Sequence, residues 1–162
     1  MGVTSILNNK HKQFVDKIAT DYPDFCFKPG KEEHWSPKTK TITYNPDEPE
    51  QKLQYGLLHE LAHAVLGHKN YQNDFELLKL EAEAWQLATK LGKKYKVVIK
   101  DEHVQNCLDT YRDWLHSRST CPAFGMHVLQ KDAENYHCFN CQAVWHVSSG
   151  RFVRSYRKTL RT

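Results

Sequence analysis

Residues 56–68 read GLLHELAHAVLGH, and this stretch decides how the chain is interpreted. Within it, His59, Glu60 and His63 form the pattern H-E-x-x-H. Residues four apart on a helix lie about one turn apart on the same face, so the two imidazoles can reach one ion. The other faces of this segment are rich in leucine, which predicts a buried helix with one polar stripe.

The three residues of the pattern have different chemical tasks. Imidazole nitrogens are common zinc ligands, whereas the carboxylate next to them can accept a proton from a water molecule that the ion activates. The pattern therefore predicts a catalytic zinc site, with His59 and His63 as metal ligands and Glu60 as the catalytic base. Three specified positions in five can arise by chance, but a polar stripe on an otherwise apolar helix needs partners and favours a real site.

A catalytic zinc site needs a third protein ligand. Glu81 falls in the middle of the apolar face of the next expected helix, where a carboxylate without a partner would be costly. His68 is the alternative, and it reaches the site only if the helix that carries the motif ends at Gly67. Helix-face geometry favours Glu81, which leaves His68 as a surface or supporting histidine. Glu83 is expected on the opposite, solvated face.

Two segments resemble the ImmA/IrrE family of gluzincin-like zinc metallopeptidases. They are TITYNPDEPEQKLQYGLLHELAHAVLGH at residues 41–68 and LEAEAWQLA at residues 80–88. The resemblance covers about residues 5–95 and implies a short sheet before the H-E-x-x-H helix. It also implies that an E-x-E-A pattern on a later helix provides the glutamate ligand, here Glu81. The sequence departs at Trp85, where the family commonly has Asn or Asp. A transcriptional repressor as protein substrate is a further implication of the resemblance.

The pattern of elements predicts an α+β protein. The expected helices span about residues 6–22, 49–67, 73–95 and 101–118. Three short strands between residues 25 and 44 are expected to form a small antiparallel sheet. After residue 118, turn residues and alternating apolar positions indicate a small β ribbon. We therefore expect a zinc metallopeptidase domain at residues 1–118 and a zinc-ribbon-like module with a basic tail at residues 119–162.

Three of the five cysteines gather in this C-terminal module. Cys138 and Cys141 form a C-x-x-C knuckle, and Cys121 precedes it. A complete zinc ribbon would have a second cysteine near Cys121, so this module is a degenerate ribbon. The three thiols indicate a second, structural zinc ion whose fourth ligand is His127 or His137, or else a module that has lost its metal.

The basic C-terminal tail suggests a nucleic-acid partner. The net charge of +4 is mild, and the tail carries a large share of it. The basic residues of the tail are Arg151, Arg154, Arg157, Lys158 and Arg161. Aromatic residues are interleaved with them, which suits phosphate contacts with base stacking, although basic tails are more often simply solvated.

The sequence also bears on the cellular compartment. No apolar run approaches the roughly 20 residues that a membrane-spanning helix needs, and the first residues lack the pattern of a signal peptide. The odd number of cysteines argues against a secreted disulfide framework. We therefore expect a cytoplasmic protein without a membrane partner.

Two other functions compete with this interpretation. In the first, the zinc is structural and the chain is a non-catalytic module that binds DNA or a protein partner. In the second, the chain is a DNA-associated protease of the SprT-like kind, which also joins an H-E-x-x-H core to a C-terminal ribbon but has a histidine as its third ligand. The intact Glu60 argues against the first, and Glu81 distinguishes the chain from the second.

Overall fold

The computed structural model describes residues 3–147 and 157–160, and it confirms the α+β class. In chain order its elements are α1 (Val3–Asp21), β1 (Cys26–Pro29), β2 (His34–Ser36), β3 (Thr41–Tyr44), α2 (Glu50–Leu66), α3 (Asp74–Tyr95), α4 (Asp101–Ser119), β4 (Asn135–His137), β5 (Val144–Val147) and β6 (Arg157–Leu160). The bounds of all four helices agree with the expected ones to within a few residues.

The chain divides into two compact units. The first holds residues 1–69 and 82–100, and the second holds residues 70–81 and 101–162. The division passes through the middle of α3, which is one continuous helix. The boundary between a peptidase domain and a ribbon module, expected after residue 118, stays a prediction.

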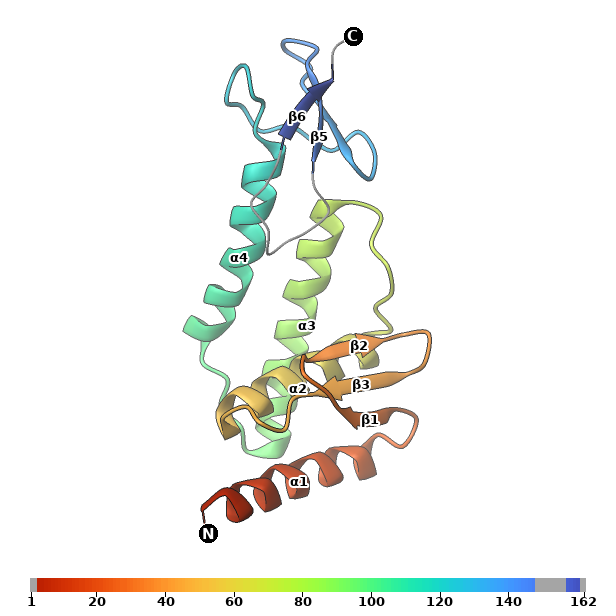
Figure 1. Ribbon diagram of the computed structural model, residues 1–162, viewed down its shortest axis with the longest axis vertical. Coiled ribbons are helices and arrows are strands. Elements are labelled where there is room, and N and C mark those ends of the chain that lie inside the picture. The colour runs from red at the N-terminus through yellow and green to blue at the C-terminus, as the bar shows by residue number, and fades with distance from the viewer. Residues whose placement is uncertain (1–2, 148–156, 161–162) are drawn as a thin grey trace. The chain divides into compact units, whose positions relative to one another are not determined.

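The sheet of the first unit has three strands, as expected, but it is mixed rather than antiparallel. Its order is β1-β3-β2, with β2 antiparallel and β1 parallel to β3 (Figure 1). The antiparallel expectation was wrong because β3 inserts between the two earlier strands and pairs with both. The chain leaves β1 at Gly30, where an added Cβ would lie 2.3 Å from Thr43 Cγ2, so a larger residue here would force the Thr43 side chain to move.

Helix α2 forms the centre of the first unit. Pro49 precedes its first turn, and Gly67 ends it in the left-handed conformation with φ of 69°. Its buried leucines belong to the same core as Ile18 of α1 and Ile42 of β3. These leucines are Leu53, Leu57, Leu58 and Leu61. An apolar core on one side of α2 therefore holds the H-E-x-x-H segment in place.

The second unit contains α4 and a three-stranded antiparallel sheet of order β4-β5-β6. Its core is small and consists of Cys121, Tyr136, Cys138, Trp145 and Val147. Trp145 and Tyr136 stack with their ring centroids 5.7 Å apart. The aromatic pair and two of the three clustered cysteines therefore share one core.

Candidate functional site

The two histidines of the motif face each other from successive turns of α2. His59 Nε2 lies 3.2 Å from His63 Nε2. Two nitrogens that are each about 2.0–2.1 Å from a tetrahedral zinc ion lie about 3.3–3.4 Å apart, so this separation suits two ligands of one ion. His59 is buried and Glu60 is partly exposed, which leaves the carboxylate accessible from solvent.

Glu81 completes the predicted three-ligand set. One ligand atom each from His59, His63 and Glu81 lies within 4.8 Å of the other two. Glu81 is only 7% exposed, and it immediately precedes Ala82, where the first unit resumes along α3. The three residues predicted from the sequence therefore come together, while their binding of a metal stays a prediction.

The donor set fits zinc. Two imidazoles and one carboxylate are the ligands of many catalytic zinc sites, which keep a fourth position for water or substrate. The chemistry of these donors therefore matches the expected ion.

His68 lies beside His63 and is 8% exposed. Its Nδ1 is 2.9 Å from His63 Nδ1, on the side of the His63 ring away from the nitrogen that faces His59. It is therefore not part of the three-ligand group. Glu83 was expected on a solvated face; its side chain is 43% exposed, and its carboxylate oxygen also lies 3.5 Å from His68 Nε2. The sequence analysis did not predict this contact. The end of the helix at Gly67 was the one signal that His68 could turn away from the helix axis.

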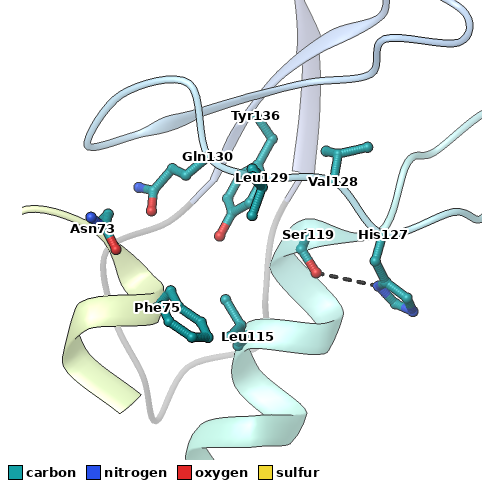
Figure 2. Close-up of a pocket in the computed structure, with 9 residues that line it drawn as sticks. All are labelled: Asn73, Phe75, Leu115, Ser119, His127, Val128, Leu129, Gln130 and Tyr136. Carbon is teal, nitrogen blue, oxygen red and sulfur yellow. Dashed lines mark hydrogen bonds between the residues drawn. The ribbon is translucent and has the colours of Figure 1, made fainter. Parts of the chain in front are cut away.

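A hollow of about 520 Å³ lies within the second unit (Figure 2). Phe75 of α3 and Leu115 of α4 line it, as do residues of the segment before β4. At its edge the hydroxyl of Ser119 is 3.3 Å from His127 Nδ1. The hollow contains none of the three predicted catalytic ligands, so it is separate from the chemistry of the H-E-x-x-H motif.

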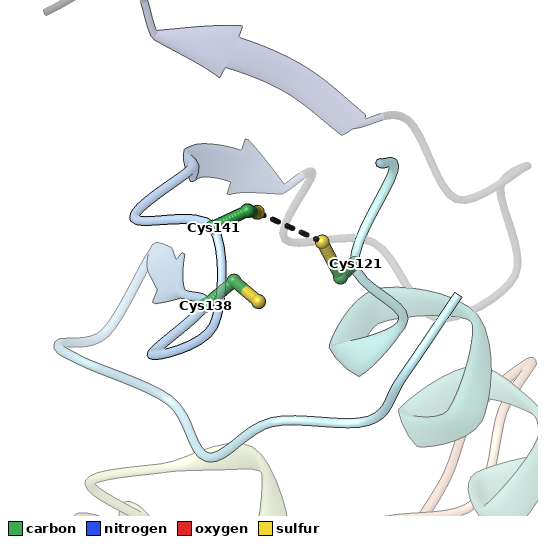
Figure 3. Close-up of side chains that lie close together, drawn as sticks. All are labelled: Cys121, Cys138 and Cys141. Carbon is green, nitrogen blue, oxygen red and sulfur yellow. Dashed lines mark hydrogen bonds between the residues drawn. The ribbon is translucent and has the colours of Figure 1, made fainter. Parts of the chain in front are cut away.

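The three C-terminal cysteines also converge (Figure 3). The Sγ atoms of Cys121, Cys138 and Cys141 lie within 4.8 Å of one another, and those of Cys121 and Cys141 are 3.6 Å apart. This spacing is near the roughly 3.8 Å between two thiolates of a tetrahedral zinc ion and well beyond a disulfide bond of about 2.05 Å. The donors fit a soft divalent ion.

Neither histidine proposed as the fourth ligand joins the thiols. His127 Nδ1 lies 3.3 Å from the hydroxyls of Ser119 and Thr120, and His137 Nε2 lies 3.0 Å from Gln142 Oε1. Within the part of the chain that the structure describes, the thiol group holds the three cysteines alone. Of the basic residues of the tail, Arg151, Arg154 and Arg161 lie outside the described ranges, so the nucleic-acid contact expected of the tail stays a prediction.

Comparison with known proteins identifies the family. A family model, Peptidase_M78, described as an IrrE N-terminal-like domain, matches residues 17–150. The chain belongs to this peptidase family. The match confirms the resemblance read from the sequence, although it starts later than residue 5 and extends well beyond residue 95. No curated protein and no solved structure matched the chain.

As a member of the M78 family, the chain is a peptidase of metallopeptidase type that acts on protein substrates. Its one noted departure from the family pattern, Trp85, lies directly against the site. The Trp85 ring stacks on His59 with centroids 4.1 Å apart and an interplanar angle of 24°. An aromatic contact therefore supports His59 where a polar residue is common. The spacing of four residues between Glu81 and Trp85 was the signal for this placement.

Among the residues that the structure describes, no helix combines the length and the low polarity that crossing a membrane requires.

Proposed function

We propose that this protein is a zinc-dependent endopeptidase that hydrolyses a peptide bond within a protein substrate. The observation that carries the proposal is the convergence of His59, His63 and Glu81 to within 4.8 Å, with Glu60 next to His59 on α2. Membership of a peptidase family supports it. In the proposal His59, His63 and Glu81 hold the ion and Glu60 performs the proton transfer.

Zinc bound at these residues would act as a Lewis acid that polarises the scissile carbonyl and acidifies the attacking water. Glu60 takes one proton from that water as the oxygen bonds to the carbonyl carbon. When the carbon–nitrogen bond breaks, Glu60 returns the proton to the leaving amine. The partial exposure of Glu60 suits a residue that must reach both water and substrate.

A second ion is part of the proposal. Cys121, Cys138 and Cys141 would hold a structural zinc in the core of the second unit. Two of the thiols are buried in that core, where a bound ion would add to the few apolar contacts available. The fourth ligand would then be a water molecule or a residue outside the described ranges.

The finer biological role follows from the family resemblance. The substrate would be a regulatory protein such as a transcriptional repressor. The sequence pattern adds two further expectations, that cleavage takes place in the cytoplasm and that the basic tail contacts nucleic acid. A test is to compare cleavage of repressor proteins with and without DNA. Stimulation by DNA would favour the SprT-like alternative, and cleavage that ignores DNA would favour the role proposed here.

Metal content decides between the proposal and its rivals. Wild type, His63→Ala and Glu81→Gln are purified without added zinc and analysed by elemental analysis. Loss of about one equivalent in both variants is the expected result, and zinc that remains would belong to the thiols. If both variants keep all the wild-type metal, the chain is a binding module. If only Glu81→Gln keeps it, the third ligand is a histidine, as in the SprT-like alternative.

Glu60→Gln separates metal binding from catalysis. The variant should retain the wild-type metal content and lose cleavage of an unfolded protein substrate by about 10²–10⁴-fold, because general-base catalysis contributes that much. Glu32→Gln, at an exposed loop residue, is the matched control and should cleave normally. Full activity of Glu60→Gln would refute its assignment as the base.

A further inference from the structure

A chain of three side chains leads away from the motif within the first unit. His63 Nδ1 lies 2.9 Å from His68 Nδ1, and His68 Nε2 lies 3.5 Å from Glu83 Oε2. The other nitrogen of His63, Nε2, faces His59 at 3.2 Å. Each nitrogen of the His63 ring therefore has a different neighbour, and the order is Glu83, His68, His63 and then the predicted metal position.

The fold holds His68 in this place from several sides. Gly67 ends α2 in the left-handed conformation, and the backbone N–H of His68 then donates to the carbonyl of His63 at 3.0 Å. The Trp35 indole N–H donates to the carbonyl of His68 at 2.9 Å. The His68 side chain is also buried. These contacts place the ring accurately, as a positioning residue requires.

We propose that His68 is a positioning residue for the metal ligand His63 and that Glu83 orients His68. The inference rests on the proposed function, in which His63 binds the ion through Nε2. Ligating histidines commonly donate their other ring N–H to a neighbouring acceptor, which selects the tautomer and the ring orientation. Here a second histidine takes the place of the more common carboxylate or carbonyl.

One arrangement of protons satisfies the whole chain. If Nε2 of His63 offers its lone pair to a metal, the ring proton of neutral His63 lies on Nδ1. That N–H donates to Nδ1 of His68, whose own proton must then lie on Nε2. This second N–H then lies on the nitrogen nearest the Glu83 carboxylate, 3.5 Å from Glu83 Oε2. The partly exposed Glu83 therefore selects the tautomer of His68, and His68 selects the tautomer of His63.

The test measures zinc affinity by competition with a chelator and the ligand-field bands of the cobalt-substituted protein. His68→Leu removes the acceptor, whereas His68→Asn places an amide oxygen near the position of Nδ1. We expect His68→Leu to weaken zinc binding by about 10–100-fold and to shift the cobalt bands. His68→Asn should recover most of that loss. Glu83→Gln should weaken binding less than His68→Leu does.

Two controls match the variants in chemistry. His34→Leu changes an exposed histidine of β2, and Glu32→Gln changes an exposed loop carboxylate. Neither should alter zinc affinity or the cobalt bands. The inference is overturned if His68→Leu, or Glu83→Gln in case His68→Leu does not fold, binds zinc as wild type does. It is also overturned if His68→Asn is as weak as His68→Leu, because the effect would then not depend on an acceptor.

Failure of the proposed function would look different. In that case His63→Ala itself would leave zinc affinity and the cobalt bands unchanged. If His63→Ala abolishes the site while His68→Leu leaves it intact, the metal site stands and only the positioning role is refuted. Metal held by the thiols is recognised separately, because sulfur-to-cobalt charge transfer absorbs strongly in the near ultraviolet.

Discussion

Arg118 Nε donates to the Asp74 carboxylate at 2.8 Å, and neither side chain is more than 4% exposed. The hydroxyl of Tyr136 donates to the same oxygen at 2.6 Å, and the backbone N–H of Asp74 donates to Gln130 at 2.7 Å. Burial, followed by the bond to Asp74, raises the pKa of Tyr136. This buried ion pair therefore ties the first residue of α3 to the end of α4 and to β4 within the second unit.

Breaking this pair should be costly. Asp74→Ala leaves the Arg118 charge buried, and we expect the free energy of unfolding to fall by about 3–5 kcal/mol in urea denaturation. Glu102→Ala, at an exposed position in the first turn of α4, is the control and should change it much less. A loss below about 1 kcal/mol for Asp74→Ala would mean that the pair contributes little to the fold.

Gly67 should tolerate substitution poorly for a backbone reason alone. Its φ is 69° and an added Cβ would meet nothing within 4 Å, so the cost comes from the left-handed conformation. Gly67→Ala should lower the free energy of unfolding by about 1–2 kcal/mol, and Gly67→Asn by less, because asparagine adopts this conformation more readily. Equal losses in thermal denaturation would contradict this account.

The Asp21 carboxylate should make stability depend on pH in the acid range. The hydrogen bond from Tyr95 at 2.7 Å, and then that from Lys94, lower the pKa of Asp21 below its ordinary value. A group with a lowered pKa stabilises the folded state above its unfolded pKa of about 3.9 and loses that contribution as the pH falls through the folded pKa.

Asp21→Asn should therefore lower the melting temperature at pH 7, and the difference from wild type should shrink below about pH 3. Asp24→Asn, at an exposed neighbouring carboxylate, is the control and should show a smaller difference at pH 7. If the difference in melting temperature between wild type and Asp21→Asn is the same at pH 7 and below about pH 3, this pairing is not its source.

Trp85 and Trp114 are matched tryptophans, since both are at most 6% exposed. Trp85 stacks on His59, whereas Trp114 carries the Arg118 guanidinium over its ring. Alanine at either position should cost about 3–5 kcal/mol of stability. Only Trp85→Ala should also weaken zinc binding in a chelator competition, and Trp85→Phe should weaken it less. Equal zinc affinities for the two alanine variants would deny Trp85 a role at the site.

The thiol cluster predicts a soft-metal site that cadmium can report. Serine at Cys121, Cys138 or Cys141 should abolish the cadmium–thiolate absorption of the protein and lower its melting temperature. Serine at Cys26 or Cys107, which lie outside the cluster, should do neither. His127→Asn and His137→Asn should leave the absorption unchanged, because neither ring joins the thiols. Loss of the absorption in one of them would identify it as the fourth ligand.

Local periodicity was enough to predict much of the candidate site. The predicted ligands His59 and His63 are four residues apart on one helix, and hydrogen bonding within that helix determines which way they point. Glu81 was predicted because a carboxylate on an apolar helix face needs a partner. The bounds of the helices followed in the same way, from signals such as Pro49 and Gly67 that act within a few residues.

Other relationships join residues that are distant along the chain, and the sequence pattern does not encode them. The insertion of β3 between β1 and β2 depends on the path of the connection at Gly30. The contact of Glu83 with His68 depends on how α2 ends against α3, and the pairing of Asp74 with Arg118 spans 44 residues. The sequence by itself therefore determined the helices, the H-E-x-x-H motif and the α+β class. Only the tertiary structure decided the strand order and the partners of the polar side chains. These depend on which segments, distant along the chain, pack against one another and remove each other's polar groups from water.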